Sequence, residues 1–320
     1  MLNNKWYDCF LNALLEKYPK KMHLTQALMS LLDLEREAVY RRLRKDVAFP
    51  FQEVVKIASE WNISVDKVIG VDTGVVPFQM HSINYVNLAK QETLYLQQII
   101  QTVGKLANQP DSEFTSVCNM LPRALFAGYS SLYQFYLFKW LCLYGNGKKM
   151  TPYSQVTIPD KQQELREAYC NAIKQASNTN FIMDNMIFDY LTRDIRYFHS
   201  IQLITDKEKE LIKSELHDLL DYMSEIANNG CYPETQKNVT ICISIPNIDT
   251  NYSYVYSKDV KACFVHVFDK YTIQSFDKDM VANFRTWMLL KKKTSFQISE
   301  VDEIRRIEFF RRQYKLVDEL

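Results

Sequence analysis

Hydrophobic residues recur every three or four positions through the first 70 residues, a spacing that predicts amphipathic helices. The first helix carries Trp6, Phe10 and Leu14 on one face and ends before Pro19. The expected helices span residues 5–18, 25–32, 35–44, 52–61 and 65–69. Gly70 follows the last of them and favours a helix end. Because these short helices follow one another closely, we expect residues 1–70 to form one compact five-helix domain.

A two-residue period appears in the last third of the chain. Val239, Ile241 and Ile243 alternate with small or polar residues, as in a strand with one buried face. Similar segments follow at residues 251–257, 262–268 and 271–276. Their short spacing predicts a small antiparallel sheet with flanking helices. Residues 231–320 are therefore expected to form a small α+β domain.

The region between these two parts is expected to be helical. Residues 71–82 contain Gly and Pro without a clear period and are interpreted as a linker. A long helix over residues 83–108 alternates apolar residues at intervals of three and four, with Glu92 at one of these positions. This helix is either a coiled-coil seam or a helix packed in a bundle. Further helices are expected at residues 113–144, 161–177, 181–199 and 205–227. The predicted fold class is mainly α, with a helical middle region at residues 83–230, for which dimerisation is one role, and the C-terminal α+β part.

Composition narrows the classes of function. The chain has 320 residues, of which 47% are hydrophobic, and only 7 are Gly. It contains neither GxGxxG nor a GxxxxGK[ST] phosphate loop. The seven Cys are scattered, as in a protein of a reducing compartment. The N-terminus lacks the pattern of a signal peptide, and Lys139 interrupts the most apolar run, residues 124–144. We therefore expect a cytoplasmic protein with no membrane helix.

One local stretch has a charge pattern with a chemical meaning. The net charge of the chain is +1, so only local patches are informative. Two short helices surround a turn at Asp33 and Leu34, and the second of them opens at Glu35. Five basic residues and one acidic residue lie between Arg36 and Lys45. This arrangement predicts a helix-turn-helix whose second helix enters the major groove of DNA.

The residues expected to contact DNA lie mostly on the second helix of this motif. They are Gln26, Glu35, Arg36, Tyr40, Arg41, Arg42, Arg44 and Lys45. Arg36 and Tyr40 lie one turn apart and can reach base edges, where an arginine bound to guanine adds about 1–3 kcal/mol of discrimination. Glu35 can accept a hydrogen bond from cytosine.

The remaining candidates are expected to hold the phosphate backbone, which supplies affinity rather than specificity. Arg41, Arg44 and Lys45 are placed for this role, and Gln26 can reach a phosphate from the preceding helix. Arg42 is expected on the same outer arc of the helix. It could contact DNA or form an ion pair with an acid such as Glu53 inside the domain.

The same stretch resembles the phage-repressor (Xre-type) helix-turn-helix domain. The resemblance is carried by AVYRRLR at residues 38–44, by F-x-F-x-E at residues 49–53 and by S-x-D at residues 64–66. It covers about the first 70 residues only. The resemblance implies a bundle of five helices and sequence-specific DNA binding, usually as a dimer.

The sequence departs from the family pattern at four positions. Met29 stands where a small Ala is usual, and Glu35 stands where Ser is common. Asp33 and Lys45 occupy turn positions where the family usually has Gly. A left-handed backbone is tolerable for Asp and less so for Lys. The acids Glu35 and Glu37 at the start of the reading helix would repel phosphate.

Two other clusters have alternative interpretations. An aromatic stripe could line a ligand pocket, although core packing is the default for rings at helical spacing; it comprises Tyr129, Tyr133, Phe135, Tyr136, Phe138, Trp140 and Tyr144. Asp189, Arg193, Asp194 and Arg196 could form a buried charged cluster or intrahelical ion pairs.

The sequence therefore predicts a transcriptional regulator that binds double-stranded DNA as a homodimer, with a C-terminal region that senses a signal, either a small molecule or a protein. The first alternative is an interaction protein, antitoxin-like or adaptor-like, whose helix-turn-helix contacts protein. The second is an enzyme with its catalytic part in residues 110–320, but we expect no enzymatic activity, cofactor or metal site. The five His lack metal-ligand spacing, and no nucleophile motif is present.

Overall fold

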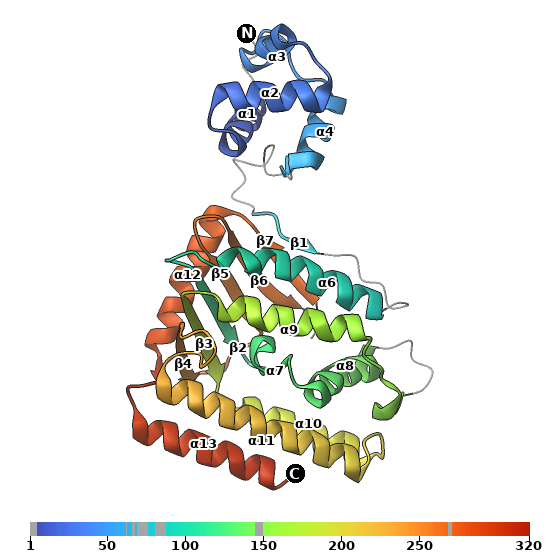
Figure 1. Ribbon diagram of the computed structural model, residues 1–320, viewed down its shortest axis with the longest axis vertical. Helices are drawn as coiled ribbons and strands as arrows, with labels where there is room; N and C mark the ends of the chain where they lie inside the picture. Colours follow the sequence, from blue (N-terminus) through green and yellow to red (C-terminus); the bar gives the residue numbers. More distant parts are fainter. Residues whose placement is uncertain are drawn as a thin grey trace. The chain divides into compact units, whose positions relative to one another are not determined.

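The computed structural model describes residues 5–61, 63–65, 68, 76–80, 88–144, 150–267 and 271–320. The chain divides into two compact units, Met1–Pro77 and Phe78–Leu320, called here the N-terminal and C-terminal units. Within the described residues it is a mixed α/β protein with twelve α-helices and one eight-stranded mixed sheet (Figure 1). None of the described helices is both long and apolar enough to span a membrane.

The N-terminal unit is a small helical bundle. Its described helices are α1 (Lys5–Lys17), α2 (Lys21–Leu32), α3 (Arg36–Leu43) and α4 (Phe51–Trp61). They match four of the five expected helices, and most of the fifth, at residues 65–69, lies outside the described residues. Phe10, Leu28, Val39 and Ile57 are fully buried at the centre, one from each helix. The three-four spacing of apolar residues therefore produces a single core.

Hydrogen bonds of Tyr7 connect α1 to the end of α3 and the segment after it. The Tyr7 hydroxyl donates to the carbonyl oxygen of Arg42 at 3.1 Å and accepts from the backbone N–H of Phe49 at 3.2 Å. Burial raises the pKa of Tyr7, since ionisation would place a charge in the core. These bonds connect elements about 40 positions apart and fix the C-terminal end of α3.

The C-terminal unit is built on one sheet with the strand order β1-β7-β6-β5-β2-β3-β4-β8. The strands are β1 (Gln79–Met80), β2 (Glu113–Cys118), β3 (Asn178–Asp184), β4 (Asn238–Ser244), β5 (Tyr252–Tyr256), β6 (Lys261–Val267), β7 (Tyr271–Ser275) and β8 (Ser295–Gln297). β2, β3 and β4 are parallel, while the other neighbours are antiparallel.

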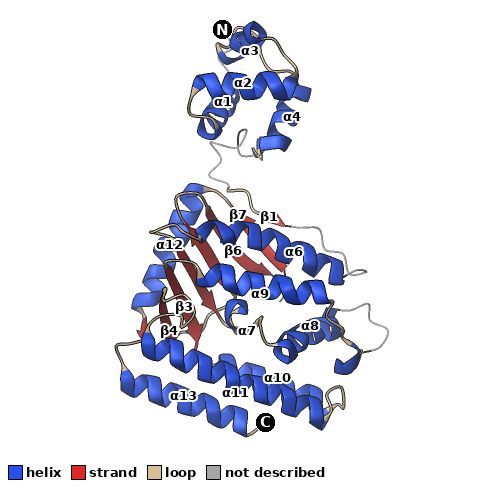
Figure 2. Ribbon diagram, in the orientation of Figure 1, coloured by secondary structure: helices blue, strands red, loops and turns tan. Residues whose placement is uncertain are grey.

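Helices cover both faces of this sheet. They are α6 (Leu88–Val103), α7 (Arg123–Phe126), α8 (Ser130–Tyr144), α9 (Asp160–Lys174), α10 (Ile187–Ser200), α11 (Asp206–Asn229), α12 (Lys278–Lys293) and α13 (Glu303–Asp318), with short 3-10 helices at Gly104–Leu106 and Tyr153–Gln155. α12 packs Val281 and Met288 against one face, beside Val117 of β2. The other helices form a thicker layer and a larger core on the opposite face (Figure 2).

The sheet is larger than expected and mixed rather than antiparallel. The helices predicted at residues 113–144 and 181–199 are wrong at their starts, because β2 and β3 occupy those positions. β3 pairs with β4, so the regions 83–230 and 231–320 contribute strands to the same sheet. Both β2 and β3 are buried on both faces, and their sequences EFTSVC and NTNFIMD mix polar and apolar residues without a two-residue period.

Two further differences concern the predicted linker and the long helix. Gln79–Met80, inside the expected linker, pairs with β7 as strand β1. The described part of the predicted helix at residues 83–108 is α6, which packs along α9 and continues into a 3-10 turn (Figure 1). Glu92 of α6 is 2% exposed. α6 thus packs as one helix of the layer over the sheet, the second of the two alternatives for this segment.

Candidate DNA interface

A left-handed residue makes the turn between α2 and α3. Asp33 has φ 54° and ψ 49°, and its N–H bonds to the carbonyl oxygen of Met29, which ends α2. Glu35 is extended and begins α3. Lys45, just after α3, has φ 66°. The sequence predicted non-glycine residues at left-handed turn positions here, and the structure confirms that backbone at Asp33 and Lys45. Asp tolerates it better than a residue with a long side chain.

The third helix separates a polar outer arc from an apolar inner one. Since successive residues turn by about 100°, Glu37 and Arg41 fall on the arc opposite Val39, whereas Arg36, in the first turn, lies about 60° from Val39. All three are exposed, whereas Val39 is fully buried. Tyr40 lies at the border of the outer arc and is half-buried. The polar groups of α3 are therefore presented together on one side.

Arg36 and Tyr40 form a stacked and hydrogen-bonded pair. The Arg36 guanidinium donates to the Tyr40 hydroxyl from Nη2 at 3.1 Å and from Nε at 3.3 Å. Its carbon lies 5.4 Å from the centre of the tyrosine ring. The two residues predicted to reach base edges are thus in contact, one helical turn apart, and each limits the motion of the other.

Arg42 lies on the inner arc, not on the outer arc where the sequence analysis placed it. It follows Ala38 by one turn and forms a two-pronged ion pair with Glu53 of α4, with both N–O distances 2.7 Å. The side chains are 14% and 19% exposed. Arg42 also donates to the Ala38 carbonyl oxygen at 3.2 Å. Of its two predicted roles, the structure shows the ion pair inside the domain.

Acidic neighbours offset two more of the predicted cations. Arg44 lies 2.7 Å from Glu37 and 3.2 Å from Asp46. Lys45 forms an ion pair with Asp8 of α1. The excess positive charge available on this surface is therefore smaller than the local sequence suggests, because acids from α1, α3 and the following turn lie beside it.

Arg36 and Arg41 are the exposed cations of α3, and neither makes an ion pair within the part of the chain that the structure describes. Gln26 of α2 and Glu35 are exposed as well, and the Glu35 side chain makes no capping hydrogen bond. Together with Arg36 and Tyr40, these groups are the predicted site residues whose polar atoms can meet a ligand without breaking an ion pair.

The two acids of the charged stretch of α10 form tertiary ion pairs rather than intrahelical ones. Asp189 pairs with Arg312 of α13 at 2.8 Å. Asp194 pairs with Lys139 of α8 at 2.5 Å. These contacts join α10 to its neighbouring helices, so the charges connect the helix layer.

Sequence reasoning missed a buried polar cluster in the C-terminal unit. Arg123 of α7 lies between the rings of Tyr95 and Tyr136, and it stands 3.5 Å from the carboxylate of Glu92. The Tyr133 hydroxyl donates to the same carboxylate. The acid at an otherwise apolar position of α6 was the available signal, but the sequence does not show which cation approaches it.

Comparisons with known proteins assign no function to this chain. No protein-family model, curated protein or solved structure matches it. Among the described residues, no group of three or more His, Cys, Asp and Glu is placed to hold a metal ion. The feature with a definite chemical meaning is a helix that follows a left-handed turn and presents Arg36, Tyr40 and Arg41 to solvent.

Proposed function

We propose that the N-terminal unit is a sequence-specific DNA-binding helix-turn-helix of the phage-repressor type and that the chain regulates transcription as a homodimer. The observation that supports this proposal is the exposed polar arc of α3, presented after the left-handed turn at Asp33. In such motifs the second helix lies in the major groove and the first crosses the phosphate backbone. Here these helices are α3 and α2.

Each free polar group on this surface has a role in the proposal. Arg36 reads a guanine, and its contact with Tyr40 orients the guanidinium before DNA arrives. Arg41 lies farther around the helix and holds a phosphate, as does Gln26 from α2. Glu35, at the start of α3, accepts from a cytosine amino group. Arg42 supports the fold, because its donors are bound to Glu53.

The proposal is tested by selecting duplexes from a random pool with the full chain. We expect a palindromic site whose half-sites lie about 34–36 Å apart, as two-fold symmetry requires. Arg41→Gln should then reduce the dependence of log affinity on log salt by about 0.9, the value for one phosphate contact. Arg36→Ala should relax base preference at one position while most nonspecific affinity remains.

Lys207→Gln supplies the matched control, because it removes an exposed positive charge from α11 in the other unit. It should leave the salt dependence unchanged. Absence of enriched sequences at moderate salt would overturn the proposal. An unaltered salt dependence in Arg41→Gln would exclude the assigned role of Arg41.

One observation favours the alternative of an interaction protein. Phe51 at the start of α4 is 76% exposed, and Val55, one turn later, is 45% exposed. Large apolar side chains grouped on a surface often mark protein contacts. An adaptor would use this face of α4 and would select no DNA sequence, so the duplex selection distinguishes the two functions.

A further inference from the structure

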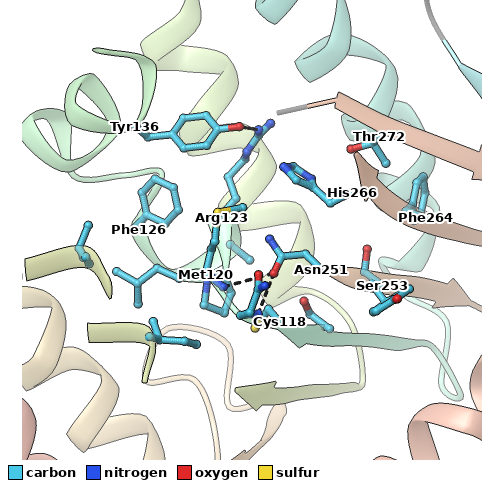
Figure 3. Close-up of a pocket in the computed structure, with 18 of the residues that line it drawn as sticks. Cys118, Met120, Arg123, Phe126, Tyr136, Asn251, Ser253, Phe264, His266 and Thr272 are labelled. Carbon is cyan, nitrogen blue, oxygen red and sulfur yellow. Dashed lines mark hydrogen bonds between the residues drawn. The ribbon is translucent and has the colours of Figure 1, made fainter. Parts of the chain in front are cut away.

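A cavity of about 160 Å³ lies inside the C-terminal unit, between the helix layer and the face of strands β2, β5, β6 and β7 (Figure 3). It continues into a more polar mouth whose lining includes Lys139, Asp194 and Asp249. Its walls come from α6, α7, α8, α9 and α10 as well as the sheet. The cavity adjoins the loop after β2, at the carboxyl end of that parallel strand, where open α/β sheets commonly bind ligands.

Small hydroxyl side chains on the sheet create this space. Ser116 of β2 and Ser253 of β5 are register partners, and both line the cavity. On the same face, Phe114 and Val255 occupy the next pair of positions and fill the core. Two adjacent serines therefore leave a gap in a face that is otherwise covered by large side chains.

Aromatic rings form much of the opposite wall. Phe126 of α7 and Tyr136 of α8 face the strands across the cavity (Figure 3). Phe135 adds another ring from α8, and Tyr95 of α6 and Tyr169 of α9 add rings from two other helices. Flat side chains arranged around a narrow space favour a flat ligand, since offset stacking and edge contacts both add to apolar burial.

The charged groups Arg123, Lys139 and Asp194 that line the cavity are paired, whereas Arg193 and Asp249 line only its mouth and make no ion pair with a described residue. The positive charge of Arg123 is offset by the buried carboxylate of Glu92 at 3.5 Å, and its Nη2 donates to the Tyr136 hydroxyl at 2.5 Å. At the mouth, Lys139 lies 2.5 Å from Asp194. An ionised ligand inside the cavity would lose its hydration without gaining an unpaired countercharge, which disfavours it.

Two hydroxyls that line the cavity are free to bind a ligand. Among the described residues, the side chains of Ser253 and Thr272 have no hydrogen-bond partner. The loop after β2, which also lines the cavity, is held in place by Asn251. The Asn251 Oδ1 accepts from the backbone N–H groups of Asn119 at 2.9 Å and Met120 at 3.3 Å. The site thus offers unused hydrogen-bonding groups in a preformed frame.

We propose that this cavity binds an uncharged, planar aromatic or heteroaromatic compound of one or two rings that carries a hydrogen-bonding group. The size agrees with this class, since an apolar cavity of about 150 Å³ in another protein accommodates benzene. Rings stack between Phe126 and the strands, and the polar group of the ligand meets the hydroxyls of Ser253 or Thr272. The proposal concerns the C-terminal unit and does not depend on DNA binding by the other unit.

Calorimetric titration of the full chain with indole tests the proposal directly, and indole-3-carboxylate serves as the charged counterpart. We expect saturable binding of one indole per chain and at least tenfold weaker binding of the carboxylate. Absence of saturable indole binding overturns the proposal. Equal or tighter binding of the carboxylate overturns the uncharged class of ligand.

A volume series at Ser253 locates the bound probe. Ser253→Ala keeps the space and should retain indole binding within a few-fold. Ser253→Val should weaken it, and Ser253→Leu should weaken it at least tenfold, because larger side chains fill the cavity. Valine is favoured in strands, so Ser253→Val still tests the cavity if the Ser253→Leu variant fails to fold. Thr240→Leu enlarges a half-buried hydroxyl residue of β4 outside the cavity and should leave binding unchanged. Equal affinities across the Ser253 series would overturn the assignment.

Discussion

Two arginines of the N-terminal unit and two of the C-terminal unit lie in opposite environments. On α3, Arg36 and Arg41 are exposed, and Arg41 makes no ion pair with any described residue. In the C-terminal unit, Arg123 lies between two tyrosine rings, and Arg166 is 2% exposed with its guanidinium 4.4 Å from the centre of the Tyr133 ring. An exposed cation can exchange water for phosphate at little cost. A buried cation is already bound to its partners inside the unit, so it is not available to bind a polyanion.

Tyrosine burial provides the largest expected contrast between the units. Burial raises the pKa of Tyr7, the buried tyrosine among the described residues of the N-terminal unit. It raises the pKa of several buried tyrosines in the C-terminal unit, namely Tyr133, Tyr153, Tyr169, Tyr232 and Tyr254. Their stabilising effect is complete below pH 10 and is lost as pH rises from 10 through the folded pKa values. In that window each such tyrosine lowers the unfolding free energy by about 1.4 kcal/mol per pH unit. We therefore expect the C-terminal unit to lose stability more steeply with pH than the N-terminal unit.

Alkaline unfolding of the full chain, followed by tryptophan fluorescence, measures this contrast. Trp6 and Trp61 report the N-terminal unit once Trp140 and Trp287 are replaced by Phe, and the reverse replacements report the C-terminal unit. Tyr169→Phe is the matched control and should reduce the slope of the C-terminal unit by the share of one tyrosine. A steeper loss in the N-terminal unit would contradict the expectation.

The buried pair of Glu92 and Arg123 should show the next largest effect. Glu92→Leu removes the carboxylate that faces Arg123 and accepts from Tyr133, and it leaves a guanidinium that is only 11% exposed without a countercharge. The expected loss is about 3–5 kcal/mol in the unfolding free energy of the C-terminal unit. Denaturant unfolding reported by Trp140 and Trp287 measures it.

The double variant Glu92→Leu with Arg123→Met separates an unpaired charge from lost packing. It should be more stable than Glu92→Leu alone, because no buried charge then remains without a partner. If the double variant is the less stable of the two, packing around the acid, rather than charge, determines the loss.

Arg42 should behave like the interior arginines of the other unit rather than like its neighbour Arg41. Arg42→Met leaves Glu53 without a partner and should destabilise the N-terminal unit by about 2 kcal/mol, the magnitude for hydrogen bonds to charged groups. It should leave the salt dependence of DNA binding unchanged. Denaturant unfolding and a salt titration of DNA affinity test the two halves of this prediction. If Arg42→Met instead reduces the salt dependence of DNA binding and leaves stability unaltered, Arg42 contacts DNA.

Local signals allowed the elements of the N-terminal unit to be predicted. Apolar spacing defined its helices, and the turn positions of Asp33 and Lys45 followed from the family resemblance. The prediction that Arg42 lies on the outer arc of α3 is wrong, because the pairing of Arg42 with Glu53 depends on how α3 and α4 pack. Helical angles place Arg42 as far from Val39 as the exposed Arg36, so neither the angle nor the charge separates the paired arginine from the exposed one.

The C-terminal unit was harder to predict because its strands pair over long sequence separations. β4 was found from its alternation, whereas β2 and β3 lack that period and are buried on both faces. The cavity depends on Ser116 and Ser253 becoming neighbours through pairing of β2 with β5. Such juxtapositions of small residues leave no local pattern, although Phe135 and Tyr136 of the aromatic stripe, for which a ligand pocket was one interpretation, do line the cavity.

The smallest expected effect concerns Glu37, which lies on the outer arc of α3 and pairs with Arg44. Both side chains are more than half exposed, so this pair contributes little to stability. Glu37→Gln should raise nonspecific DNA affinity about threefold, because it removes a repulsive charge and leaves Arg44 with Asp46 as its remaining acidic partner among the described residues. Glu60→Gln removes an exposed acid from the last turn of α4 and is the control. A gain for Glu37→Gln alone would support α3 as the DNA-facing helix. An equal gain for both variants would mean that only the net charge of the unit matters, and the distinction between exposed and paired cations on α3 would fail.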